Sequence, residues 1–310
     1  MKRRTRLLST LALAAITATA LAACGSSSNP VSSEGGNDSG SSAGSVVIGS
    51  TNFPENELLA NIYADVLRAK GVKVSTQLNI GSREIVYKLI QSGKITVLPE
   101  YNGALLAYLD PKTTATTKDA TDQELSAKLD PKLEVLEPSS AEDKDSLNVT
   151  KANAEKYDLH SIADLTKVAD TFTLGGPPEF KTRLQGVVGL KSVYGVDFSD
   201  RFQPLDEAGK LTIDALKDGS VQVADIFSTD PSIVANNFVT LTDPKGLFGA
   251  QNVVPLVYKA GVNQTIVDAL NAVSAKLDTP TLARLVSEVV SDKKDSTAVA
   301  SEFAKSAGLV

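Results

Sequence analysis

The sequence predicts an α/β protein with two lobes, and three observations lead to this prediction. Short strands alternate with amphipathic helices from residue 46 to about residue 108, a rhythm typical of a mostly parallel sheet flanked by helices. A second stretch, from about residue 163 to residue 230, repeats that rhythm. Residues 263–309 then show only helical periodicity. We therefore expect two mixed, mostly parallel sheets, each flanked by helices.

The first half contains three segments with the apolar or alternating pattern of strands. These strands are expected over residues 45–50, 72–78 and 95–98. Helices are expected after them, over residues 53–70, 81–93 and 99–108, and glycines mark their ends. Asn52 or Thr51 is the expected cap of the first helix, and Pro54 suits its first turn.

The second half repeats the pattern in shorter form. Strands are expected over residues 172–174 and 221–224, and helices around residues 163–165, 189–194 and 211–217. The segments LIQSGKITVLPEYNG and ALKDGSVQVADIFSTD share the order helix, glycine turn, strand and aromatic residue. Their aromatic residues, Tyr101 and Phe227, follow strand ends, where open α/β sheets bind ligands.

The N-terminus has the features of an export signal. Basic residues precede an apolar stretch over residues 7–20, which is too short to span a bilayer comfortably. Leu21-Ala22-Ala23-Cys24 then resembles the bacterial lipobox, in which the cysteine is lipidated. We expect a signal peptide over residues 1–23, a lipid anchor at Cys24 and a Gly/Ser-rich tether over residues 24–45.

Composition argues against several functions. The chain has 31 Lys and Arg against 37 Asp and Glu, and removal of the signal peptide would take away four more basic residues. An acidic chain is poorly suited to nucleic acid. It has one histidine, His160, and one cysteine, so we expect no metal site, no cofactor and no catalytic triad. His160 is interpreted as a surface residue, and residues 175–178 (Gly-Gly-Pro-Pro) as a turn that cannot cradle phosphate.

Four segments resemble the substrate-binding proteins of osmoprotectant (glycine betaine, choline, carnitine) ABC importers. They read IGSTNFPENELLANIYADVLRAKGVKV, NIGSREIVYKLIQSGKITVLPEYNGALLAYL, GGPPEFKTRLQGVVGLKSVYG and LKDGSVQVADIFSTD. The resemblance covers about residues 46–257. Its most specific motifs are Pro-Glu-Tyr-x-Gly and Gly-Pro-Pro-Glu-Phe-x-Thr-Arg.

The resemblance implies a two-lobed, type II periplasmic-binding (venus flytrap) fold that closes on its ligand by a hinge motion. We expect one lobe from residues 46–145 with 252–310 and the other from residues 146–251. The implied partners are a small solute and the permease and ATPase subunits of an ABC importer. The protein is expected to be a monomer, anchored by lipid to the outer face of the cytoplasmic membrane, with no enzymatic activity.

The resemblance also implies a site in which aromatic faces hold a quaternary ammonium group and cationic or hydroxyl donors hold a carboxylate. Tyr101 matches the family's cage tyrosine, Phe227 stands in place of a tyrosine, and Arg183 matches the arginine after Glu-Phe-x-Thr. The ligand-binding residues expected from these motifs are Phe53, Arg83, Glu100, Tyr101, Asn102, Arg183, Phe227, Thr229, Gln251 and Asn252.

The chain departs from the family's pattern at four positions, which are Thr51, Ile80, Arg83 and Gln251. Two cage aromatics are thereby replaced, Arg83 would take over as the carboxylate clamp, and Phe53 or Tyr87 would supply a further ring. These departures leave open an alternative, a different polar or aromatic metabolite as ligand. A hydrolase that uses Glu100 or Asp230 as base is a third hypothesis, which the sequence supports least.

Overall fold

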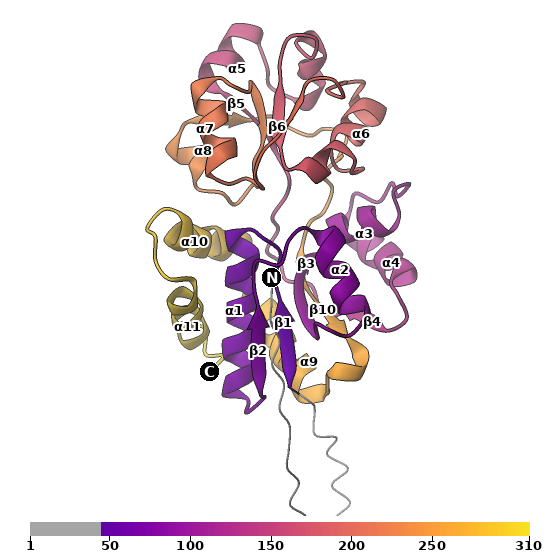
Figure 1. Ribbon diagram of the computed structural model, residues 1–310, viewed down its shortest axis with the longest axis vertical. Coiled ribbons are helices and arrows are strands. Elements are labelled where there is room, and N and C mark those ends of the chain that lie inside the picture. Colours follow the sequence, from indigo (N-terminus) through magenta and orange to yellow (C-terminus); the bar gives the residue numbers. More distant parts are fainter. Residues whose placement is uncertain (1–44) are drawn as a thin grey trace, which may run out of the picture. The chain divides into compact units, whose positions relative to one another are not determined.

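The computed structural model describes residues 45–310, whose strands form two five-stranded sheets. The first sheet has the order β2-β1-β3-β10-β4 (Figure 1). Its strands are β1 (Val46–Gly49), β2 (Val74–Gln77), β3 (Val97–Tyr101), β4 (Leu133–Val135) and β10 (Val253–Tyr258). Strand β1 pairs in parallel with β2 and β3, whereas β10 is antiparallel to β3 and β4.

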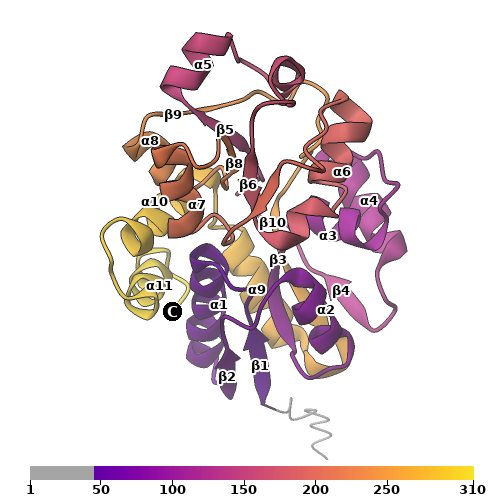
Figure 2. The same cartoon turned by 45° about the horizontal axis from the view of Figure 1, so that its top comes forward.

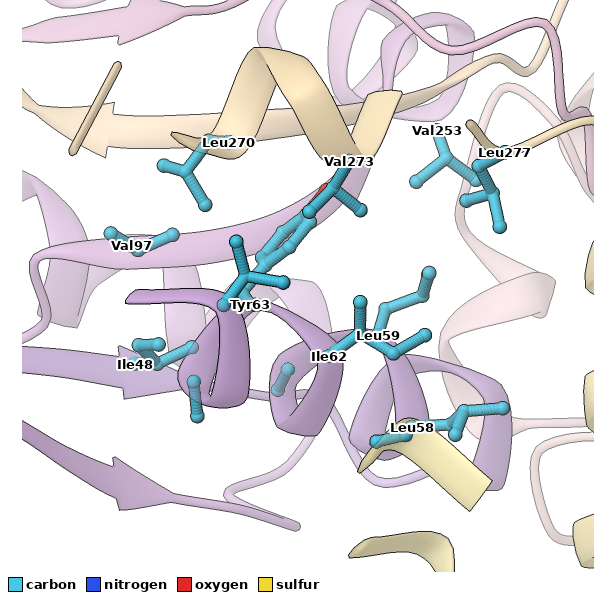
Figure 3. Packing of buried hydrophobic residues seen from close by; sticks show 14 of the residues in the cluster. Ile48, Leu58, Leu59, Ile62, Tyr63, Val97, Val253, Leu270, Val273 and Leu277 are labelled. Carbon is cyan, nitrogen blue, oxygen red and sulfur yellow. The ribbon is translucent and has the colours of Figure 1, made fainter. Parts of the chain in front are cut away.

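Helices cover both faces of the first sheet, because its strands place apolar side chains alternately on either side. Ile48, Val97 and Val253 join one core cluster with Leu59 and Tyr63, as Figure 3 shows. Leu98 and Leu256 face the opposite cluster. The helices of this part are α1 (Pro54–Ala69), α2 (Arg83–Gln91), α3 (Asn102–Leu109), α4 (Lys118–Lys128), α9 (Gln264–Ser274), α10 (Thr279–Val290) and α11 (Ser296–Ser306).

The second sheet has the order β7-β6-β8-β5-β9. Its strands are β5 (Leu147–Thr150), β6 (Leu174–Gly176), β7 (Phe202–Pro204), β8 (Val223–Asp225) and β9 (Phe238–Thr240). Strand β6 is parallel to β7 and β8, and β5 is antiparallel to β8 and β9. Its helices include α5 (Lys151–Tyr157), α6 (Val187–Gly189), α7 (Lys210–Asp218) and α8 (Ser232–Ala235). Figure 2 shows α7 beside strands β8 and β5, and α8 lies against β9.

The α/β class and the mixed sheets are confirmed, although each sheet has equal numbers of parallel and antiparallel pairings. The expected side-chain cap of the first helix is wrong. Phe53 occupies the N-cap position without a side-chain hydrogen bond. Asn56, which lies inside the helix, instead accepts a hydrogen bond from the Thr51 amide at 2.9 Å, so residues 51 and 52 are held as an entry loop.

The chain passes between the sheets twice, through residues 136–146 and 241–252. Within residues 45–310, no helix combines the length and the apolar character needed to cross a bilayer. The expected signal peptide, Cys24 and nearly all of the tether lie outside the described residues.

Candidate functional site

Chain segments at one edge of each sheet meet around a central cavity of about 30 Å³. Phe53, Arg83 and Tyr101 follow or end β1, β2 and β3, while Arg183 and Phe227 follow β6 and β8. The carboxyl ends of parallel strands are the usual ligand-binding edge of such sheets. The residues that line the cavity are Phe53, Arg83, Tyr101, Ala104, Asp143, Asp145, Arg183, Glu207, Phe227 and Gln251.

Three aromatic rings gather at this cavity. The Phe53 ring centroid lies 6.1 Å from that of Tyr101 and 4.8 Å from that of Phe227. The second pair joins residues that follow strands of different sheets. Tyr87, the other ring considered from the sequence, packs against Tyr108 at 5.4 Å and does not line the central cavity. Of the two suggested rings, therefore, only Phe53 lies at the site.

Glu55 connects the two sides of the site by hydrogen bonds. Its carboxylate accepts the Tyr101 hydroxyl at 2.6 Å and the Thr229 hydroxyl at 2.6 Å. Burial raises the pKa of Glu55, and the hydrogen bonds from Thr229 and Tyr101 act in the opposite direction. The Tyr101 ring is thereby held at the cavity by its hydroxyl end. Sequence reasoning missed Glu55, although its position in the first turn of a helix beside Phe53 was visible.

Arg83 is paired with a carboxylate of the first sheet. Its guanidinium donates Nε and Nη2 to Glu100 at 2.9–3.1 Å, and only 1% of the Glu100 side chain is exposed. Glu100 also accepts the Tyr101 backbone amide at 3.0 Å. Arg83, which the sequence suggested as the clamp for a ligand carboxylate, is therefore paired with a carboxylate of the protein itself.

Arg183 forms the corresponding pair between the two halves of the chain. It donates Nε and Nη2 to the two oxygens of Glu84, both at 3.0 Å, and Glu84 belongs to α2. Burial favours the neutral acid, but the hydrogen bonds from Arg183 prevail and lower the pKa of Glu84 to about 2. This ion pair and the bond from Thr229 to Glu55 join segments that belong to different sheets.

Four further carboxyl groups lie at or behind the cavity wall, and sequence reasoning named none of them. Asp143 accepts the Thr229 amide at 3.0 Å and the Ser228 hydroxyl at 3.1 Å. Burial raises the pKa of Asp143, of Asp145 and of the nearby Asp225. The negative charge of Asp145 raises the pKa of Asp225 further. Asp143 and Asp145 precede β5, Asp225 ends β8, and Glu207 stands in a loop, so no periodic sequence pattern marks these acids.

Burial raises the pKa of Glu207 to about 7, although Arg183 and Arg83 lower it; Asp145 and Glu179 add to the increase. Protonated Glu207 stabilises the folded state fully below pH 4.5, the ordinary pKa of a glutamate. This stabilisation is lost as the pH rises through about 7. We expect the free energy of unfolding to fall between pH 5 and 8 relative to Glu207→Gln. Urea titrations of both proteins across this range would measure it, and parallel pH profiles would contradict it.

The remaining predicted residues divide into two groups. Thr229 bonds Glu55, and Gln251 lines the cavity while accepting the Ala104 amide at 2.8 Å. Asn102 and Asn252 lie behind the wall, where the Asn252 amide donates to Asn102 at 2.8 Å and fixes the start of α3. His160 is exposed, as expected. The described residues contain no cluster of three or more metal-ligating His, Cys, Asp or Glu side chains.

The fold and the site define a solute-binding protein with an aromatic cavity between two α/β sheets. The chain belongs to the family described as the substrate-binding domain of the ABC-type glycine betaine transport system, which matches residues 44–306. It is similar to the glycine betaine-binding protein YehZ of Escherichia coli K12, with 29% identity over 86% of this chain and 92% of that one.

Two further comparisons agree. The carnitine transport binding protein OpuCC of Listeria monocytogenes is 24% identical over 85% of this chain and 87% of its own. A crystal structure described as a glycine betaine/carnitine/choline ABC transporter superposes with a TM-score of 0.65 at 24% identity, covering 85% of this chain and all but 1% of that one. The type II periplasmic-binding fold is thus confirmed, and the chain's family acts outside the cytoplasm and supplies solutes to ABC importers.

Proposed function

We propose that this protein captures a compatible solute with a quaternary ammonium group and delivers it to an ABC import permease. The observation that carries the proposal is the meeting of Phe53, Tyr101 and Phe227 at one cavity. A quaternary ammonium group cannot donate hydrogen bonds, so aromatic faces are its natural partners, worth about 0.5–2 kcal/mol each. Solutes of this kind are bound by the relatives named above, which supports the same class here.

Binding would require the site to open. The central cavity of about 30 Å³ has room for roughly one water molecule, and a trimethylammonium group is several times larger. We propose that residues 46–145 with 252–310 form one lobe, that residues 146–251 form the other, and that they rotate about the two connecting segments. The bonds from Arg183 to Glu84 and from Thr229 to Glu55 would hold the closed form.

We further propose that the protein acts as a monomer, tethered to the outer face of the membrane through lipidated Cys24. The lipobox-like sequence and the Gly/Ser-rich segment that follows it support this placement.

A catalytic role is not part of the proposal. Both oxygens of Glu100 are engaged with Arg83, and Asp230 accepts the amide of Ser232 at 2.7 Å, so each candidate base already has donors.

Titration calorimetry of residues 46–310 with glycine betaine, choline, carnitine and proline betaine tests the proposal. We expect micromolar binding of at least one ligand and a loss of about tenfold on Tyr101→Ala, since one aromatic face is removed. Tyr157→Ala is the control, because Tyr157 packs on Phe172 outside the cavity. A folded protein that binds none of the four would favour the alternative, a different polar or aromatic metabolite.

A further inference from the structure

The charged groups at the central cavity are unequal in number. Two guanidinium groups, those of Arg83 and Arg183, line it together with the carboxyl groups of Asp143, Asp145 and Glu207. Glu100 and Glu84, the partners of the two arginines, add two further carboxylates directly behind them. Five acids therefore surround two permanent cations. Because burial raises the pKa of Asp143, Asp145 and Glu207, the field at this position attracts a positively charged ligand most strongly above pH 7, where Glu207 is ionised.

Both arginines already have carboxylate partners from the protein. Each donates Nε and Nη2 in a two-pronged pair, to Glu100 and Glu84 respectively, which is the geometry a ligand carboxylate would otherwise occupy. Asp145 also lies close enough to raise the pKa of both arginines. A carboxylate on the ligand would have to compete with these internal partners and approach Asp145 and Glu207 at the same wall.

The acids, in contrast, keep free hydrogen-bonding capacity. Among residues 45–310, no side chain or amide donates a hydrogen bond to the carboxyl group of Glu207, and neither Glu207 nor Asp145 forms an ion pair within 4.0 Å. The side-chain partner of Asp145 is the buried acid Asp225, which shares a hydrogen bond with it. Asp225 stands beside Asp145 and is 1% exposed, and its Oδ1 atom has no hydrogen-bond partner. Polar atoms with unused hydrogen-bonding capacity are costly to bury, so a cation or donor that approaches Asp145 and Glu207 in the cavity wall would be favoured.

We propose that the site selects solutes with a net positive charge and no carboxylate, with the ammonium group on the rings of Phe53, Tyr101 and Phe227 and facing Asp145 and Glu207. The inference deepens the function proposed above and rests on it. Because zwitterionic compatible solutes carry the same ammonium group plus a carboxylate, selection would act on that second group alone. A hydroxyl in its place could donate to the free acids without opposing them.

Choline and glycine betaine make a matched pair for the test, because they share the trimethylammonium group and differ in an alcohol against a carboxylate. Calorimetric titrations at pH 8, where Glu207 is largely ionised, should show choline binding at least about tenfold more tightly. Glu207→Gln should weaken choline binding by about tenfold and leave glycine betaine binding equal or tighter. Asp170→Asn, an exposed acid outside the cavity, should change neither affinity.

The outcomes separate the two proposals. One outcome is that the protein binds both ligands equally, or glycine betaine more tightly, and still loses affinity on Tyr101→Ala. That result would overturn the charge selection and leave the proposed function intact. The charge selection would also be overturned if Glu207→Gln did not weaken choline binding. Glu207 would then only take the place of a ligand carboxylate beside Arg183. Absence of binding by either ligand, with a normal circular dichroism spectrum, would overturn this inference. If carnitine and proline betaine also failed to bind, the proposed function would be rejected with it.

Discussion

Replacing Arg83 by methionine is expected to lower the free energy of unfolding by about 3–5 kcal/mol, because the buried Glu100 carboxylate loses its partner. The Arg83 and Glu100 side chains are 11% and 1% exposed, so water cannot replace the guanidinium. An unpaired buried carboxylate becomes protonated near neutral pH instead. The loss should therefore be largest at high pH and smaller near pH 5. Urea denaturation at several pH values would measure both effects.

Two controls test the cause. The double variant Arg83→Met/Glu100→Gln removes the stranded charge, and we expect it to recover at least half of the lost stability. Arg68→Met breaks an exposed pair with Asp65 within α1, which should cost less than about 1 kcal/mol. If the double variant were as unstable as Arg83→Met, loss of packing and not the unpaired carboxylate would be the cause.

Phe180→Ala is the second substitution with a large expected effect, about 3–5 kcal/mol of unfolding free energy. Phe180 is fully buried, and its ring centroid lies 6.4 Å from those of both Phe202 and Phe248. It anchors the short turn that carries Arg183 three residues later. Besides the cavity that it leaves, the substitution should loosen the pairing of Arg183 with Glu84, so ligand binding should weaken as well.

Thermal unfolding followed by circular dichroism, together with calorimetric titration, would measure both consequences. Lys181→Ala is the matched control, because the adjacent side chain is exposed and its removal should change stability by no more than about 0.5 kcal/mol. A Phe180→Ala protein with reduced stability but unchanged ligand affinity would show that Phe180 supports the core without positioning Arg183.

The strand that ends at Tyr101 shows where sequence reasoning was sound and where it was limited. The apolar run over residues 95–98 correctly predicted a strand, but the following helix was expected from residue 99, where a proline cannot donate to a sheet. In the structure β3 continues to Tyr101, since Pro99 stands opposite Pro255 of β10. Antiparallel strands contain pairs that exchange no hydrogen bonds, and two prolines can face each other there without loss.

Several elements carried no readable signal. Strands β4, β7 and β9 are only three residues long, and their neighbours on the sheet, not their own pattern, hold them in place. The candidate site shows the same limit. Phe53, Tyr101 and Phe227 were predicted from strand ends and motifs, but the pairing of Arg183 with Glu84 joins residues 99 positions apart. Periodicity reports local structure, so it cannot reveal such contacts.

The packing of the C-terminal helix has a practical consequence for turning this protein into a fluorescent reporter. Helix α11 lies against α1, whose first turn carries Glu55 next to Phe53, and Leu309 is buried in the same core cluster. Val310 is about half exposed. A dye or fluorescent domain can therefore be fused after Val310, whereas shortening the chain to before Leu309 would remove support from the helix that begins at the ligand cavity.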